Sequence, residues 1–145
     1  MRALLQRVTE ARVRIDDRVA GEIGRGLCVL VGVTHDDTDA HAKRLAEKVW
    51  TLRVFDDPEG VMNMAIAEVG GEVLVVSQFT LYGDVRKGRR PSWTEAARPE
   101  QAEPVCDAFV VALRELGATV ATGVFGAEMQ VELVNDGPVT LMVEV

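Results

Sequence analysis

The sequence predicts a single α+β domain, residues 1–145, in which two main helices pack on a mixed, largely antiparallel, barrel-like sheet. Two stretches have apolar residues at helical spacing, and about seven others have the alternation or the continuous apolar run of a strand. Most connections between these segments are short and turn-like, as in antiparallel sheets. A chain of 145 residues can bury one independent core and is too short for two domains.

The first part of the chain predicts a hairpin followed by a buried strand. Residues 2–15 alternate imperfectly between polar and apolar, Asp16-Asp17 gives a turn signal, and 19–23 resume the pattern. After a glycine-rich break, residues 27–33 form a continuous apolar run. Such a run predicts a strand that is buried on both faces.

The middle of the chain predicts a helix, a strand and a long loop. Residues 35–39 are rich in the capping and acidic side chains that start helices. Apolar residues then fall at helical spacing: Ala42, Leu45, Ala46, Val49 and Leu52. We expect residues 56–60 to end this helix, Met62 and Met64 to lie in the core, and 73–81 to form a strand. Residues 82–99 predict a loop of a length that is usually functional or mobile.

The last part of the chain predicts a second helix and the remaining strands. Between residues 99 and 116 the apolar positions have helical spacing: Val105, Cys106, Phe109, Val110 and Leu113. Gly117 follows where a C-cap glycine is expected. Residues 119–124, 128–134 and 139–145 have strand patterns and complete the sheet.

The composition of the chain predicts where the protein is located and which partners it binds. No apolar leader follows Met1 and no stretch approaches the ~20 apolar residues of a membrane span, so we expect a cytoplasmic protein without a membrane partner. Cys28 and Cys106 lie in apolar segments, which predicts buried free thiols. The net charge of −7 disfavours indiscriminate binding to nucleic acid, and we expect no DNA partner. One dense basic cluster remains suited to an RNA that touches a single face: Arg86, Lys87, Arg89 and Arg90.

Polar residues end the otherwise apolar strand predicted at 73–81. A buried hydroxyl or amide without a partner costs roughly 1–3 kcal/mol, so Ser77, Gln78 and Thr80 are not core filler. One interpretation is a strand that leaves the core, with its hydroxyls bonded to nearby backbone. The other is a site for chemistry, in which strand alternation places Ser77 and Phe79 on one side and Gln78 and Thr80 on the other.

The segment Asn135-Asp136-Gly137-Pro138 also has two interpretations. Asp-Gly is a common hairpin turn, and a proline can open the next strand. Alternatively, the Gly137–Pro138 bond is cis and its carbonyls form fixed pocket walls without side chains.

The sequence indicates neither a cofactor nor a metal. A strand, and not a helix, follows the glycines at 21, 24 and 26, so these do not form a phosphate loop. His35 and His41 are poorly spaced for one helical face and have no cysteine beside them. They also lie in the helix-start segment, where nothing in the spacing pairs them with Ser77 or Thr80 as a catalytic base. Any hydrolysis here could therefore use a proton shuttle that is not a protein side chain.

The segments Ser77-Gln78-Phe79-Thr80-Leu81 and Asn135-Asp136-Gly137-Pro138-Val139-Thr140 together resemble the D-aminoacyl-tRNA deacylase family, also called the D-tyrosyl-tRNA deacylases. Supporting segments are 6–8, 26–33, 62–63 and 86–92, so the likeness covers essentially the whole chain. Two departures are Gly83 and Trp93, where the family more often has alanine and phenylalanine.

The resemblance implies a homodimer that hydrolyses D-aminoacyl-tRNA, with active sites at the subunit interface. The segment 77–80 of one subunit would meet a cis Gly137–Pro138 of the other, whose main chain rejects L-amino acids and admits D-amino acids and glycine. Arg7 would brace Gly137–Pro138, and Met129 would line the same pocket.

The resemblance also implies roles at the reacting ester. Thr80 and the backbone N–H groups around Gln78 and Phe79 would polarise the ester carbonyl, and Phe79 would position the terminal adenosine. Thr80 as nucleophile and the ribose 2′-hydroxyl as the group that assists water both remain open, and the lack of a base favours the second. The basic cluster would contact phosphates of the acceptor stem.

Two other classes of function remain as alternatives. One is a non-catalytic RNA-binding homodimer that shares the fold, because a fold does not by itself imply a function. The other is an esterase or amidase acting on small molecules, for which the same oxyanion chemistry would serve. The polar motifs weigh against the first alternative and the basic cluster against the second.

Overall fold

A six-stranded mixed sheet is organised around the long first strand. The computed structural model describes residues 1–145. On one side β1 (Arg2–Ile15) pairs antiparallel with β2 (Arg18–Ile23) and β3 (Gly26–Gly32), and on the other it pairs with β8 (Gln130–Glu144). The sheet continues from β3 through two parallel pairs, to β6 (Glu72–Ser77) and β7 (Val120–Thr122).

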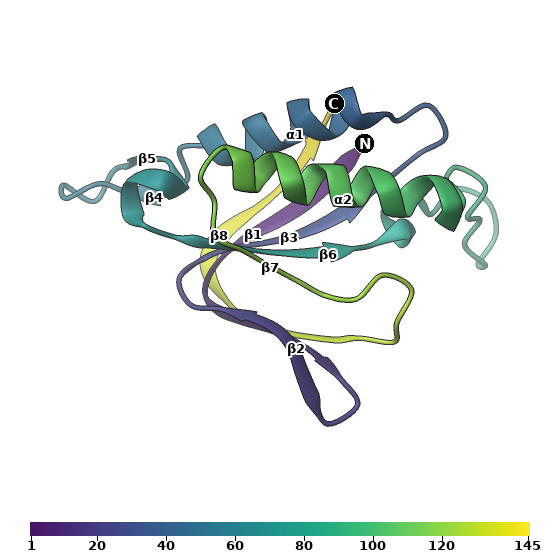
Figure 1. The fold of residues 1–145 in the computed structure, drawn as a ribbon, viewed down its shortest axis with the longest axis horizontal. Helices are drawn as coiled ribbons and strands as arrows, with labels where there is room; N and C mark the ends of the chain where they lie inside the picture. Colours follow the sequence, from purple (N-terminus) through teal and green to yellow (C-terminus); the bar gives the residue numbers. More distant parts are fainter.

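Both helices lie on the same face of this sheet (Figure 1). They are α1 (Asp39–Thr51) and α2 (Pro99–Glu115), and each buries an apolar stripe against the strands. Helix α1 starts after Thr38, whose backbone N–H donates to Nδ1 of His41 at 3.1 Å. Gly117 follows α2 with φ 106°, a left-handed value that favours glycine, as the C-cap pattern predicted. The larger core cluster lies between these helices and the sheet.

The sheet curls until its two ends approach each other. A side chain at Gly21 in β2 would place its Cβ 2.4 Å from the carbonyl oxygen of Thr122 in β7. Because Gly21 has no side chain, the strands β2 and β7 can pass this close together. A second, smaller apolar cluster fills the face away from the helices, with Val8, Val13 and Leu74 among its members. The predicted fold class, two helices on a mixed and barrel-like sheet, is confirmed.

Several predicted boundaries were wrong. Helix α1 ends at Thr51, ahead of 56–60, and a small hairpin of β4 (Phe55–Asp56) and β5 (Met62–Met64) follows it. Met62 in that hairpin is 46% exposed and is therefore not a core residue. The predicted strand 73–81 stops at Ser77 because the chain turns there into a short 3-10 helix, η2 (Phe79–Tyr82).

The remaining short elements do not alter this architecture. A single 3-10 turn, η1 (Ile66–Val69), precedes β6 and buries Ile66. Cys28 and Cys106 are free and buried, as predicted. Neither helix is long and apolar enough to cross a membrane.

Candidate active site

The segment 77–80 lies where β6 leaves the sheet. The last strand residue is Ser77, and the backbone N–H of Gln78 still donates to the carbonyl of Val31 in β3 at 2.7 Å. Element η2 then folds back over the end of β3, against Gly32. A Cβ at Gly32 would lie 3.1 Å from the Gln78 carbonyl oxygen and from the side chains of η2, so a glycine here lets the turn pack closely.

This turn leaves two backbone donors without a partner. The first N–H groups of a helix have no acceptor inside it, and those of Phe79 and Thr80 have none elsewhere in the chain. The resemblance implied a role for the N–H groups around Gln78 and Phe79, but the Gln78 N–H already donates to the Val31 carbonyl. The Gln78 side-chain amide donates instead to the Thr80 hydroxyl oxygen. The end of β6 therefore presents free N–H groups and an oriented hydroxyl.

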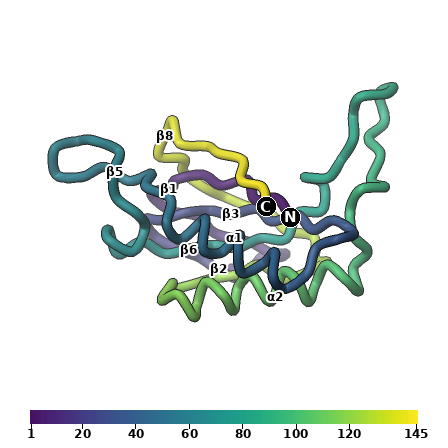
Figure 2. Tube along the Cα trace, turned by 90° about the horizontal axis from the view of Figure 1, so that it is seen from above, coloured from purple at the N-terminus to yellow at the C-terminus, as the bar shows by residue number.

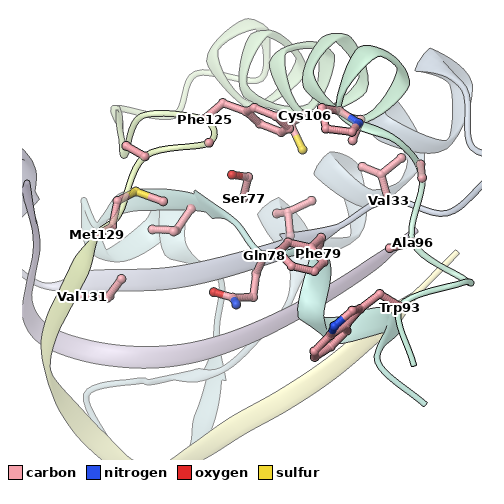
Figure 3. Close-up of a pocket in the computed structure, with 17 residues that line it drawn as sticks. Val33, Ser77, Gln78, Phe79, Trp93, Ala96, Cys106, Phe125, Met129 and Val131 are labelled. Carbon is pink, nitrogen blue, oxygen red and sulfur yellow. The ribbon is translucent and has the colours of Figure 1, made fainter. Parts of the chain in front are cut away.

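A pocket of about 550 Å³ opens beside this segment (Figure 3). Of the predicted residues, Ser77, Gln78, Phe79 and Met129 line it. In the close-up Met129 and Val131 lie on one side, Phe79 and Trp93 on the other, and Ser77 between them. Apolar lining also comes from Cys106 in α2 and from Phe125 in the loop before β8.

The pocket lining contains no side chain that could serve as a general base at neutral pH. It has 17 residues, of which 13 are hydrophobic and none is Asp, Glu, His, Lys or Arg. Burial raises the pKa of the Cys106 thiol to about 12, so this group is a neutral thiol and a poor nucleophile. The two histidines lie outside the lining, and Nε2 of His35 bonds the carbonyl of Thr94 at 2.7 Å. The pocket can thus hold an apolar or planar group next to hydrogen-bond donors.

Arg7 forms a second cluster, around the Gly137–Pro138 segment. Its side chain is buried, and its guanidinium donates to the carbonyls of Val54 at 2.7 Å, Asp136 at 3.1 Å and Gly137 at 3.4 Å. The Asp136 carboxylate adds an ion pair at 3.1 Å. A buried cation needs such partners, and this one fixes the backbone of residues 136–137.

The Gly137–Pro138 bond is cis, as the resemblance implied, and the hairpin-turn interpretation of this segment is wrong. Strand β8 runs through the segment without reversing, and its register against β1 jumps from Asn135 opposite Val8 to Thr140 opposite Gln6. The Asn135 amide spans the resulting bulge by donating to the carbonyls of Arg7 and Val139, at 2.9 and 3.1 Å. At a bulge of this kind the strand bends and its pairing with the neighbouring strand is locally interrupted.

The predicted residues therefore form two groups within one chain. Ser77, Gln78, Phe79 and Met129 share the pocket, while Arg7 and the exposed Gly137 and Pro138 do not line it. Thr80 belongs to neither group. It is exposed and does not line the pocket, but its hydroxyl accepts a hydrogen bond from Gln78, which does.

The basic cluster occupies an arm that projects from the body (Figure 2). Asp84 and Ser92 form its neck through two backbone hydrogen bonds of 2.8 and 2.9 Å. Arg86 bonds both carboxylate oxygens of Asp84 and holds the pKa of that group at about 2. Lys87, Arg89 and Arg90 are exposed and make no ion pair within the chain, so three of the four predicted cations are free to meet an anion.

Sequence reasoning missed several residues of both groups. Val131, Phe125 and Cys106 reach the pocket from three separate elements, and no local pattern connects them. The acceptor role of the Val54 carbonyl was equally hidden, because backbone groups carry no sequence signal. Asn135 could have been found, because an asparagine in a turn-like segment often hydrogen-bonds nearby backbone groups.

Known proteins resemble this chain over almost its full length. A family model described as D-Tyr-tRNA(Tyr) deacylase matches residues 4–144. A protein of Chloroflexus aurantiacus named D-aminoacyl-tRNA deacylase is 59% identical over 144 residues, which cover 99% of this chain and 90% of that protein. One of Heliobacterium modesticaldum with the same name is 58% identical, covering 99% and 96%. A solved structure named c-Myc DNA Unwinding Element Binding Protein superposes with a TM-score of 0.95 at 40% identity, covering 100% of this chain and 99% of that one.

The fold, the pocket and these relatives define an enzyme that is a hydrolase of ester bonds. The family model matches almost the full length of the chain, which identifies the family within that class. The chain belongs to the D-Tyr-tRNA(Tyr) deacylase family, as the two motifs predicted.

Proposed function

We propose that this chain hydrolyses the ester between a D-amino acid and the 3′ end of tRNA in the cytoplasm, releasing free D-amino acid and tRNA. The observation that carries the proposal is the pair of unpartnered N–H groups, on Phe79 and Thr80, beside a pocket lined by Ser77 and Gln78. Donors that are free and fixed in place suit an oxygen that becomes negative during acyl transfer. The names of the relatives supply the substrate class.

The N–H groups of Phe79 and Thr80 bind the carbonyl oxygen of the ester and stabilise the oxyanion of the tetrahedral intermediate. Loss of one such donor typically lowers kcat by about 10²–10³. The Thr80 hydroxyl, which already accepts a hydrogen bond from Gln78, can donate its own proton toward the same oxygen. Phe79 positions the terminal adenosine.

The ribose 2′-hydroxyl of the substrate assists the attacking water. The absence of an acid, histidine or lysine from the pocket lining supports this role. Cys106 is no substitute, because its pKa is raised to about 12. Thr80 as nucleophile would need a base to take its proton, and neither histidine lines the pocket.

Chirality is judged across the interface of a homodimer. Gly137–Pro138 of one subunit enters the pocket of the other, where its main chain blocks an L-substituent and leaves room for a D-substituent or for glycine. Three features support this arrangement: the segment is exposed, Arg7 fixes its backbone, and it lies outside its own chain's pocket. Strand β8, which carries it, has a free edge and exposed apolar side chains at Val134, Leu141 and Met142.

The arm of residues 84–92 contacts phosphates of the acceptor stem through Lys87, Arg89 and Arg90. Their exposure and lack of ion pairs support this contact. The DNA partner in the name of the 40% identical structure makes duplex DNA a necessary competitor in any binding assay. We expect tRNA to bind more tightly than duplex DNA of equal length.

The test of this function compares three substrates. The protein is incubated with D-Tyr-tRNA, with p-nitrophenyl acetate, and with D-tyrosine ethyl ester. Rapid release of D-tyrosine from the tRNA alone supports the proposal. Binding of the tRNA without turnover would favour the non-catalytic RNA-binding alternative, and equal turnover of the simple esters would favour the small-molecule esterase.

A further inference from the structure

Two exposed aromatic rings meet at the mouth of the pocket. The rings of Phe79 and Trp93 touch edge to face, with centroids 5.4 Å apart and planes at 74°. Phe79 is 55% exposed and Trp93 is 44% exposed, and both line the pocket (Figure 3). Two rings at this angle form an open corner, in which a planar group can stack on one ring and rest its edge on the other.

The backbone on both sides of Trp93 holds the indole in place. On one side, Ser92 forms the neck of the arm with Asp84. On the other, the Trp93 carbonyl accepts the N–H of Ala96 at 3.1 Å, and the N–H of Ala97 binds the Val33 carbonyl at 2.9 Å. Trp93 is therefore a side chain on a fixed segment and not on the tip of the arm.

Gly83 makes the space that the indole occupies. A Cβ at this position would lie 2.6 Å from Cζ3 and 3.2 Å from Cε3 of Trp93. The backbone of Gly83 has φ −66° and ψ 128°, which any residue adopts, so its conformation does not call for glycine. The indole is the nearest group that a side chain here would meet, and the Thr80 carbonyl oxygen, 3.0 Å from the same Cβ position, is the next. Gly83 and Trp93, the two departures noted in the sequence, are thus one compensating pair.

The groups joined to the corner indicate what it binds. Trp93 directly follows Ser92 in the neck of the arm, and its ring touches Phe79, whose own N–H group is free. The corner is thus connected both to the arm that is proposed to contact phosphates and to the N–H groups that are proposed to bind the ester. The group next to that ester is a nucleobase, and bases stack on aromatic side chains.

We propose that Trp93 is a positioning residue for the terminal nucleobase of the tRNA, and that Gly83 is the position that admits it. This inference rests on the proposed function, because it takes the ester of a charged tRNA as the occupant. Phe79 and Trp93 together hold the plane of the base, and this contact contributes equally to the bound substrate and to the transition state. Specificity for the 3′ end then comes from stacking, with no charged side chain in the pocket.

Kinetics of four proteins test the pair: wild type, Trp93→Ala, Gly83→Ala, and Gly83→Ala with Trp93→Phe. Loss of the stacking surface in Trp93→Ala raises KM for D-Tyr-tRNA about tenfold and leaves kcat within about twofold. Gly83→Ala alone displaces the indole and raises KM to a similar extent. In the double variant the smaller ring accepts the added methyl, and KM returns to within about threefold of wild type. An unchanged KM in Trp93→Ala, or a double variant no better than Gly83→Ala, would overturn the proposal.

Fluorescence gives a readout that does not depend on hydrolysis. The chain has two tryptophans, so in a Trp50→Phe background the emission reports Trp93 alone. Titration with the trinucleotide 5′-CCA-3′ should quench this emission saturably, and the added Gly83→Ala change should weaken the quenching. If the trinucleotide does not change the emission of a protein that still cleaves D-Tyr-tRNA, the role of Trp93 is wrong but the proposed function is not affected. Quenching in a protein that cannot cleave D-Tyr-tRNA would instead remove the proposed function.

Discussion

At the scale of single residues, Arg7 shows how one buried cation can fix a stretch of main chain. Its guanidinium reaches carbonyls from two distant segments, 54 and 136–137, as well as the Asp136 carboxylate. Only the resemblance pointed to Arg7 in the sequence, because a lone arginine in a strand is most often a solvated residue. The carbonyls that it binds could not be predicted, since they depend on the path of the folded chain.

Arg7→Ala should destabilise the protein by about 2 kcal/mol, because it leaves several buried acceptors without a donor. Urea unfolding followed by circular dichroism measures this change. Arg12→Ala is the matched control on the same strand: Arg12 has only partly exposed ion pairs at 3.7 and 3.8 Å, and should cost no more than about 0.5 kcal/mol. Equal losses in the two variants would show that Arg7 is not a clamp.

Thr80→Ala separates the two mechanisms that the sequence left open. If the substrate's 2′-hydroxyl assists water, kcat for D-Tyr-tRNA should fall by no more than about 10²–10³, the effect of one lost donor, and should stay above background because the backbone donors remain. The same protein assayed on D-Tyr-tRNA that ends in 2′-deoxyadenosine should lose most of its turnover. Activity at background in Thr80→Ala, with circular dichroism and tRNA binding unchanged, would instead identify Thr80 as the nucleophile.

At the scale of elements, the sequence predicted which segments exist better than where they end. Both helices and the buried strands followed from periodicity, since apolar spacing decides which face is buried. The strand predicted at 73–81 extends beyond the observed end of β6, because the apolar and β-branched pattern gives no sign of the turn at Gln78. Strand β8 was split in two because Asp-Gly is a strong hairpin signal. The pairing with β1, a non-local interaction, overrides that signal and absorbs residues 136–139 as a bulge.

The arm of residues 84–92 is the element with the clearest electrostatic prediction. Arg89→Glu with Arg90→Glu should weaken tRNA binding, and the slope of log affinity against log salt should become shallower by about 0.9 for each phosphate that the arm no longer neutralises. Filter binding at several salt concentrations measures both effects. Lys43→Glu with Arg44→Glu makes the same change in net charge on the exposed side of α1 and should leave the slope close to wild type. Identical slopes in all three proteins would exclude the arm as a tRNA-binding element.

At the scale of the whole molecule, the two halves of the predicted site do not meet in one chain. The pocket and the Gly137–Pro138 segment both exist, yet no residue of the second lines the first. The sequence indicated both motifs but not the distance between them, because that distance depends on how the chain folds. The proposed homodimer would bring the two halves together and would cover the free edge of β8.

Met142→Glu should weaken this homodimer, because it places a charge on the exposed part of β8. Met142 is 50% exposed in the single chain. Sedimentation velocity should show a dimer for wild type and a larger monomer fraction for the variant, with a parallel loss of D-Tyr-tRNA hydrolysis. Val111→Glu is the matched control, since Val111 is also 50% exposed but lies on α2. A monomeric wild type that keeps full activity would contradict the shared site.

The most direct measurement is the rate of hydrolysis of D-Tyr-tRNA and L-Tyr-tRNA prepared on the same tRNA and assayed at equal enzyme concentrations. A rigid main-chain barrier predicts rapid release of D-tyrosine, and release of L-tyrosine that stays at the spontaneous rate of the ester. Glycyl-tRNA, which lacks a side chain on either hand, should be cleaved as well. Equal enzymatic cleavage of the D- and L-esters would contradict the proposed basis of selection.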